Sequence, residues 1–198
     1  MIDRRVILFL ALLVTSACAD DSTGPTQQSV PEDQLTFLRP ADNAPPLAQS
    51  SVSFWAVRGE DTEVRLFYVG GDEFLEFEVD DESLLRRPDG SLFAEDDSIQ
   101  ITITVVDQQR LVVDFQPTGL LFDPDEPAEL SIRYANTDDD LNGDGEVDEE
   151  DDELEAQFSI WRQTNPGDPW FRIGTAVFED LEEVEADITS FTRYAIAY

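Results

Sequence analysis

Twelve consecutive residues, 140–151, have side chains of a type and spacing that could bind a calcium ion. Calcium takes about six to eight oxygen ligands, and short acidic or amide side chains at alternate loop positions can wrap around it. Gly145 at position 6 permits the sharp turn that such a loop needs, and Val147 at position 8 is expected to point inward and anchor it. The predicted metal ligands, at positions 1, 3, 5, 7, 9 and 12, are Asp140, Asn142, Asp144, Glu146 through its backbone carbonyl, Asp148 and Asp151.

The segment around this loop is strongly acidic. Between residues 138 and 155 there are twelve carboxylates and no arginine or lysine. Such closely spaced negative charges repel one another unless a cation neutralises them or the segment stays disordered. A solvated acidic turn is the alternative interpretation, because Asp, Asn and Gly are also common in ordinary turns. The number of positions filled by a fitting residue type favours calcium.

The loop resembles the calcium loop of the EF-hand, with one departure. Position 12 is usually a glutamate that reaches the ion with both oxygens, whereas this chain has the shorter Asp151 there. An aspartate at that position makes the loop similar to those of dockerin modules. Dockerins carry two such loops and this chain has one. The resemblance implies that calcium is the bound cofactor.

The N-terminus has the features of an export signal. Two early arginines are followed by an apolar run, residues 6–14, and by small residues before Cys18. The run of nine residues is too short to span a bilayer, which takes about 20. Residues 1–17 are therefore predicted to form a signal peptide that is removed.

Residues 15–18 resemble the lipobox of bacterial lipoproteins, in which the cysteine is acylated and becomes the new N-terminus. Thr15 departs from the leucine preferred at its place, and an ordinary secreted protein cut near Ala17 is the alternative. Cys18 is the only cysteine in the chain, which suits lipidation better than a structural role. We predict a lipid anchor at Cys18 and a place in the cell envelope. The absence of aspartate after Cys18 favours the outer membrane.

Composition narrows the possible partners and reactions. The formal net charge of −33 at pH 7 repels nucleic acid and anionic lipid, so we expect no nucleic-acid partner and membrane contact only through the lipid. The chain contains no histidine and no lysine, which excludes His-based triads, His-ligated zinc and Schiff-base chemistry. A pair of carboxylates could still hydrolyse glycosides. We predict that the protein is not an enzyme, with a carboxylate-based hydrolase as the less favoured reading.

Two regions of different character follow the signal. Residues 18–50 are rich in Pro, Ser, Gln and Asp and are predicted to form a flexible tether, although Leu35, Phe37 and Leu38 could dock onto the domain. Residues 51–198 alternate apolar and polar side chains with a period of two, which is typical of half-buried strands. The strands are expected at residues 52–57, 64–69, 75–79, 99–105, 111–115, 130–134, 156–161, 184–188 and 194–198.

Nine short strands without long helices predict an all-β fold, an antiparallel β-sandwich of immunoglobulin-like or similar type. The calcium loop would then be an insertion between the strands at 130–134 and 156–161. Only residues 149–154 could form a short helix after it. We expect calcium to order this long connection instead of switching a pair of helices.

A pattern of apolar, aromatic and turn residues runs through parts of the last 100 or so residues. It consists of Phe115, Pro117, Gly119, Leu120, Phe122, Pro127, Ala128, Leu130, Ile132, Tyr134, Trp170, Thr189, Ser190, Phe191, Thr192, Tyr194 and Ala195. This pattern resembles the β-sandwich domain shared by zonula occludens proteins, netrin receptors and ankyrins. The resemblance implies a protein-recognition module. Some members of that family cleave themselves at a His-Phe-Ser sequence, but the matching residues here are Ser190, Phe191 and Thr192, so we predict no self-cleavage.

The sequence therefore favours a calcium-binding, lipid-anchored, non-enzymatic interaction or structural module. The alternative is a calcium-responsive module that binds a protein or a glycan, whose identity the sequence leaves open. Four aromatic residues could form a platform for a glycan, but we expect them to pack in the core. They are Trp55, Trp161, Trp170 and Phe171.

Overall fold

The computed structural model describes residues 29–198. The predicted signal peptide, residues 1–17, and the predicted lipidation site, Cys18, lie outside the described residues. No helix within residues 29–198 has the length and apolar character needed to cross a membrane.

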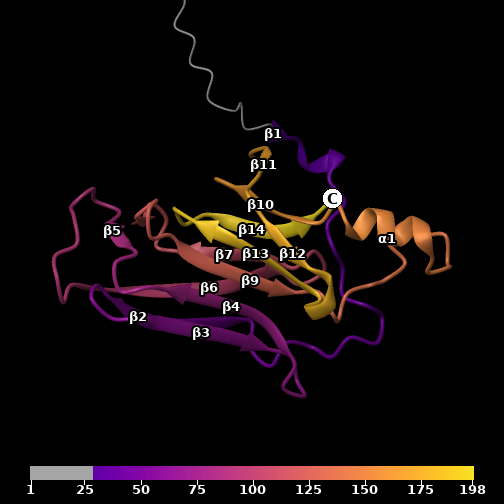
Figure 1. Cartoon of the computed structure of the whole chain (residues 1–198), viewed down its shortest axis with the longest axis horizontal. Helices are drawn as coiled ribbons and strands as arrows, with labels where there is room; N and C mark the ends of the chain where they lie inside the picture. Colours follow the sequence, from indigo (N-terminus) through magenta and orange to yellow (C-terminus); the bar gives the residue numbers. More distant parts are fainter. Residues whose placement is uncertain (1–28) are drawn as a thin grey trace, which may run out of the picture.

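Two antiparallel sheets form a β-sandwich, as predicted (Figure 1). The larger sheet has the order β1 (Ser29–Val30), β11 (Trp170–Arg172), β10 (Ser159–Gln163), β14 (Arg193–Ala197), β7 (Val112–Gln116), β6 (Ser98–Asp107) and β2 (Ser51–Val57). The smaller sheet has the order β12 (Ala176–Phe178), β13 (Glu183–Ile188), β9 (Ala128–Arg133), β4 (Glu73–Val79) and β3 (Thr62–Phe67). Two short strands, β5 (Leu84–Arg86) and β8 (Leu121–Phe122), pair separately, and the helical elements are η1 (Glu32–Gln34), α1 (Glu149–Glu155) and η2 (Glu179–Leu181).

The core lies between the sheets and is built from alternate side chains of the strands, as the period of two requires. Phe77 is at its centre, with ring centroids of Phe115, Phe122 and Phe191 at 5.1, 6.2 and 5.7 Å. All four rings are at most 1% exposed. Edge-to-face and tilted packing of this kind adds about 0.5–1.5 kcal/mol per pair beyond the burial of apolar area.

Residues 29–50, which were predicted to belong to the tether, lie against the sandwich. β1 pairs with β11 at one edge of the larger sheet, and Thr36 exchanges two backbone hydrogen bonds of 3.0 Å with Tyr198. Phe37 and Leu38 are 7% and 2% exposed, so both dock as the sequence suggested they could. Backbone pairing and two buried side chains order a segment that has no periodic pattern. The prediction of a flexible tether over residues 18–50 is therefore wrong for residues 29–50.

The outer face of the smaller sheet carries like charges directly opposite one another. Glu63 lies opposite Glu78, Glu78 opposite Glu129, and Glu129 opposite Asp187, which makes one row across four strands. Burial and the neighbouring carboxylates raise the pKa of Glu78 and of Glu129. Cross-strand pairs of like charge are destabilising. This row of carboxylates therefore works against the stability of the folded chain at neutral pH, whereas Arg65 and Arg133 form ion pairs elsewhere on the same face.

Candidate calcium loop

The candidate loop is part of the connection between β9 and β10, at the end of the sandwich where the C-terminus lies (Figure 1). Its last residues form the start of α1, which spans Glu149–Glu155 and was expected at 149–154. Asp148 is the N-cap, and its Oδ1 accepts a 2.9 Å hydrogen bond from the backbone N–H of Glu150. Four acidic residues occupy the first helical turn, where the helix dipole favours negative charge.

Five of the predicted ligand side chains accept hydrogen bonds from the backbone of their own loop. Asp140 Oδ1 accepts hydrogen bonds from the N–H groups of Gly143 and Asp144 at 2.8 and 3.0 Å, and its Oδ2 accepts one from Gly145 at 2.9 Å. Asn142 Oδ1 accepts from Asp144 at 2.8 Å. Gly145 has a φ of +91°, in the left-handed region that its position 6 was predicted to require. The loop therefore curls around the Asp140 carboxylate.

Asp144 continues this pattern, since its Oδ1 accepts a 2.9 Å hydrogen bond from the backbone N–H of Glu146. The side chain of Glu146 is exposed. Asp148 is both position 9 of the loop and the N-cap of α1.

Asp151 closes the loop. Its side chain is the buried member of the set, at 3% exposed. Oδ1 accepts from the N–H groups of Leu141 and Asn142 at 2.8 and 3.1 Å, and Oδ2 accepts from Asp148 at 3.0 Å. These hydrogen bonds, the one from Asp148 first, hold the pKa of Asp151 below its ordinary value. Position 12 is thus an ionised carboxylate that joins both ends of the loop.

The donor set fits calcium in type, but its members do not converge. Asp140 Oδ2, Asn142 Oδ1 and Asp151 Oδ2 each accept one hydrogen bond, so each oxygen keeps a lone pair for a cation. Nevertheless, within residues 29–198 no group of three or more His, Cys, Asp or Glu side chains is arranged to hold a metal ion. The described geometry brings the six predicted residues onto one closed loop without bringing their oxygens to one point.

The loop is anchored by Leu141 and not by Val147. Val147 is 68% exposed, so the prediction that position 8 points into the protein is wrong. Leu141, at position 2, is partly buried and packs against the main core. Leu141 makes the contact with the core that Val147 was expected to make, and its backbone N–H donates a 2.8 Å hydrogen bond to Asp151 Oδ1.

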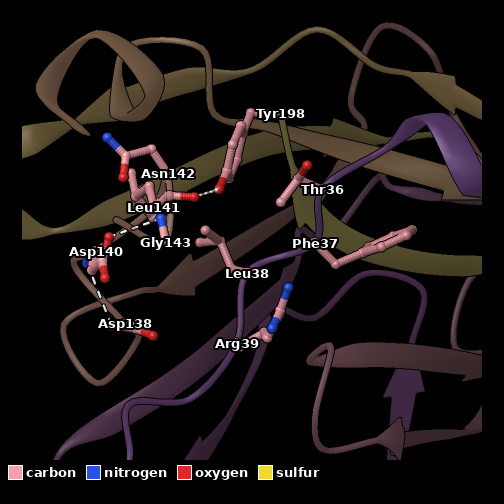
Figure 2. Close-up of a pocket in the computed structure, with 10 residues that line it drawn as sticks. All are labelled: Thr36, Phe37, Leu38, Arg39, Asp138, Asp140, Leu141, Asn142, Gly143 and Tyr198. Carbon is pink, nitrogen blue, oxygen red and sulfur yellow. Dashed lines mark hydrogen bonds between the residues drawn. The ribbon is translucent and has the colours of Figure 1, made fainter. Parts of the chain in front are cut away.

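A cavity of about 290 Å³ lies beside the loop (Figure 2). Figure 2 shows the C-terminal Tyr198 reaching across it, where the hydroxyl group donates a 2.6 Å hydrogen bond to the carbonyl of Leu141. The cavity mixes one cationic, two acidic and several apolar side chains. It is lined by Thr36, Phe37, Leu38, Arg39, Asp138, Asp140, Leu141, Asn142, Gly143 and Tyr198.

A second contact attaches α1 to the sandwich. The hydroxyl group of Tyr134 donates a 2.7 Å hydrogen bond to Glu155 Oε1, and the Tyr134 ring packs edge-to-face on Phe158 at 5.2 Å. Burial, followed by the hydrogen bond to Glu155, raises the pKa of Tyr134, so the phenol stays a donor. From the sequence, Tyr134 and Tyr198 were expected as the last residues of two strands, without a role at the loop. Their position at strand ends that flank the acidic connection is the signal that could have singled them out.

The four aromatic residues considered as a glycan platform have different surroundings. Trp161 and Trp170 are buried, at 9% and 1% exposed, which confirms core packing for them. Phe171 is half-buried beside Arg162, whose guanidinium lies 5.9 Å from the ring centroid. Trp55 is 60% exposed, so the favoured reading of core packing is wrong for Trp55.

No family model, no curated protein and no solved structure matches this chain. The resemblances to the EF-hand and dockerin loops, to bacterial lipoproteins and to the zonula occludens, netrin receptor and ankyrin domain therefore stay predictions. Many of the aromatic and aliphatic residues that carry the last resemblance are buried, including Phe115, Phe122, Phe191 and Tyr194. Core packing explains those residues without any family.

Proposed function

We propose that this chain is a calcium-binding, lipid-anchored protein of the cell envelope that acts as a non-enzymatic interaction or structural module. The observation that carries the proposal is the closed loop of residues 140–151, in which the buried Asp151 carboxylate holds the backbone of positions 2, 3 and 9. These hydrogen bonds already fix the two ends of the loop relative to each other. Little backbone ordering remains to oppose binding.

Calcium would be held by oxygens that are near one another in the loop. Asp140, Asn142 and Asp144 would contribute side-chain oxygens, Glu146 its carbonyl, and Asp151 its carboxylate, with Asp148 acting directly or through water. Each carboxylate oxygen has two lone pairs, so it can keep a backbone N–H partner while it turns the other lone pair to the ion. Rotation of these side chains is the rearrangement that binding demands.

The acidic charge of the segment supports a cation. Two positive charges would offset part of the repulsion among the twelve carboxylates of residues 138–155. Extracellular calcium modules bind at about 0.1–1 mM, so a site outside the cytoplasm would usually be filled. Because the loop touches the C-terminal residue, and that residue pairs with Thr36, the bound ion would stabilise the end of the sandwich.

Isothermal calorimetry tests the metal site. The wild-type chain should release heat on titration with calcium, and Asp140→Ala and Asp144→Ala should each abolish it. Asp139→Asn is the matched control, since it removes one charge from the same segment immediately outside the loop. Calcium at ten times its dissociation constant should also stabilise the fold by about 1.4 kcal/mol, and removal with a chelator should reverse this shift in melting temperature. The proposal is contradicted if the wild type shows no heat of binding, or if all variants show the same heat.

A further inference from the structure

The outer face of β2, β6 and β7 differs in charge from the rest of the surface. Its outward side chains lie in rows across the three strands: Ser53 is opposite Thr102, which is opposite Gln116, and Trp55 is opposite Gln100. We call this set the neutral face. It consists of Ser51, Ser53, Trp55, Gln100, Thr102, Thr104 and Gln116. None of these seven is charged, in a chain with 45 acidic residues among 198.

The charges at the borders of the neutral face are paired. At one end Arg193 Nε lies 3.2 Å from Asp114 Oδ1, where Asp114 is opposite Thr104. At the other end Arg87 forms a 2.9 Å ion pair with Asp97 and donates to the carbonyl of Ser98. The face therefore carries no net charge from one border to the other, whereas the outer face of the smaller sheet carries the carboxylate row.

Trp55 is exposed on β2, the edge strand of this face. The other two tryptophans are at most 9% exposed, and their indole N–H groups donate to Ala197 O and Glu32 Oε2 at 3.0 and 3.3 Å. Tryptophan is highly buried on average, so an indole that is 60% exposed leaves a large flat apolar surface in water. Such a ring can pack against an apolar face of a partner, while its N–H and the neighbouring side chains form hydrogen bonds to polar groups of that partner.

The hydroxyl groups beside Trp55 leave hydrogen-bonding capacity. Ser53 Oγ and Thr102 Oγ1 lie 2.8 Å apart, and Ser51 Oγ and Thr104 Oγ1 are also 2.8 Å apart. A hydroxyl has one donor and two acceptor lone pairs, so each pair can still bond to a ligand. Strands are spaced about 4.8 Å apart, and outward residues recur about every 6.8 Å along a strand. The face therefore offers a lattice of neutral polar groups next to one stacking surface.

We propose that the neutral face binds an uncharged polysaccharide, with a sugar ring stacked on Trp55 and its hydroxyl groups bonded to the Ser, Thr and Gln side chains. Charge argues for this class of partner. An acidic polymer is repelled by the chain as a whole, and a basic one finds next to the neutral face only Asp114, which is already paired with Arg193. A protein interface ordinarily has an apolar core of several side chains, whereas this face has one aromatic residue. The proposal does not depend on the calcium loop, which lies in the β9–β10 connection.

Affinity electrophoresis in native gels tests this proposal. Gels cast with hydroxyethylcellulose, xyloglucan, laminarin or amylopectin should retard the wild-type chain in at least one case, and gels cast with alginate should not. Trp55→Ala should weaken binding to the retarding polymer by about tenfold or more, and Gln100→Ala by several-fold. Phe178→Ala is the matched control, because Phe178 is 41% exposed on β12 of the other sheet and should bind as the wild type does.

Unchanged migration in all four neutral polymers, or equal retardation of wild type and Trp55→Ala, overturns the proposal. The proposal would also be overturned if the wild type sedimented as a dimer and Trp55→Ala as a monomer. The neutral face would then bind a second copy of the chain. Each gel is run with calcium at about 1 mM and with a chelator. If binding to the polymer depends on Trp55 but calorimetry shows no calcium binding, this proposal holds and only the metal proposal is contradicted. If calcium binds but the polymer does not, the metal proposal holds and this one is contradicted.

Discussion

The hydroxyl group of Tyr198 donates a 2.6 Å hydrogen bond to the carbonyl of Leu141, 57 residues earlier in the chain. This contact joins the last residue to position 2 of the acidic loop. Burial raises the pKa of Tyr198, so the phenol remains protonated and able to donate at neutral pH. Leu141 also packs against the core, and Asp151 bonds to its N–H. Leu141 therefore connects the loop, the core and Tyr198.

Tyr198→Phe should weaken calcium binding and lower stability. Removal of the hydroxyl leaves the Leu141 carbonyl without its partner, which costs about 1 kcal/mol. Without this contact the ion-free loop would be more mobile, and calcium binding would have to order it. We therefore expect several-fold weaker calcium binding in calorimetry and a lower melting temperature. Tyr68→Phe is the control, since the Tyr68 hydroxyl is buried without a hydrogen-bond partner and its loss should leave stability unchanged or higher. Equal behaviour of the two variants would contradict a role for this contact.

Glu129→Gln should stabilise the fold at pH 7. Glu129 lies between Glu78 and Asp187, so the change removes two like-charge contacts worth about 0.2–1 kcal/mol each. The measurement is the melting temperature. Glu60→Gln, at an exposed residue between β2 and β3, is the control and should have little effect.

The gain from Glu129→Gln should depend on pH. The pKa of Glu129 is raised above 4.5 in the fold, by burial first and then by Glu185 and Glu78. The folded chain therefore favours the protonated form, and the cost of ionisation appears as pH rises through the folded pKa. The gain should be full at pH 7 and should shrink as pH falls toward 4.5. A constant gain at all pH values would assign the effect to something other than this carboxylate.

Cys18→Ala should release the protein from membranes. If Cys18 is acylated, the wild-type chain should enter the detergent phase in a temperature-induced phase separation, and the variant should stay in the aqueous phase. The acidic charge of the chain gives it no attraction of its own for anionic lipid. Equal partition of both proteins would point to an unmodified cysteine.

The all-β architecture followed from the sequence because apolar side chains alternate along the longer strands. Each of the nine predicted strands overlaps an observed one, from β2 to β14. The remaining strands, β1, β5, β8, β11 and β12, have two or three residues each, and a period of two cannot be recognised over so few. β1 and the segment that follows it were assigned to the tether for the same reason. They are held by backbone pairing, which leaves no compositional trace.

The loop was predictable only in part. The spacing of Asp140, Asn142 and Asp144 indicates which side chains share the turn, because each bonds to a backbone N–H a few residues ahead. The anchoring residue was not predictable, since Leu141 and Val147 are both apolar and only the path of the flanking strands selects between them. Trp55 was misjudged because an alternating pattern does not say which face of an edge strand is covered.

β1 and β2 are the two edge strands of the larger sheet. Six strand spacings of about 4.8 Å separate them, a width of about 29 Å. The chain enters the sandwich through β1, and only ten residues lie between Cys18 and Ser29. In a domain anchored at that cysteine, Trp55 would therefore lie on the sheet edge opposite the strand that begins nearest to the anchor in sequence.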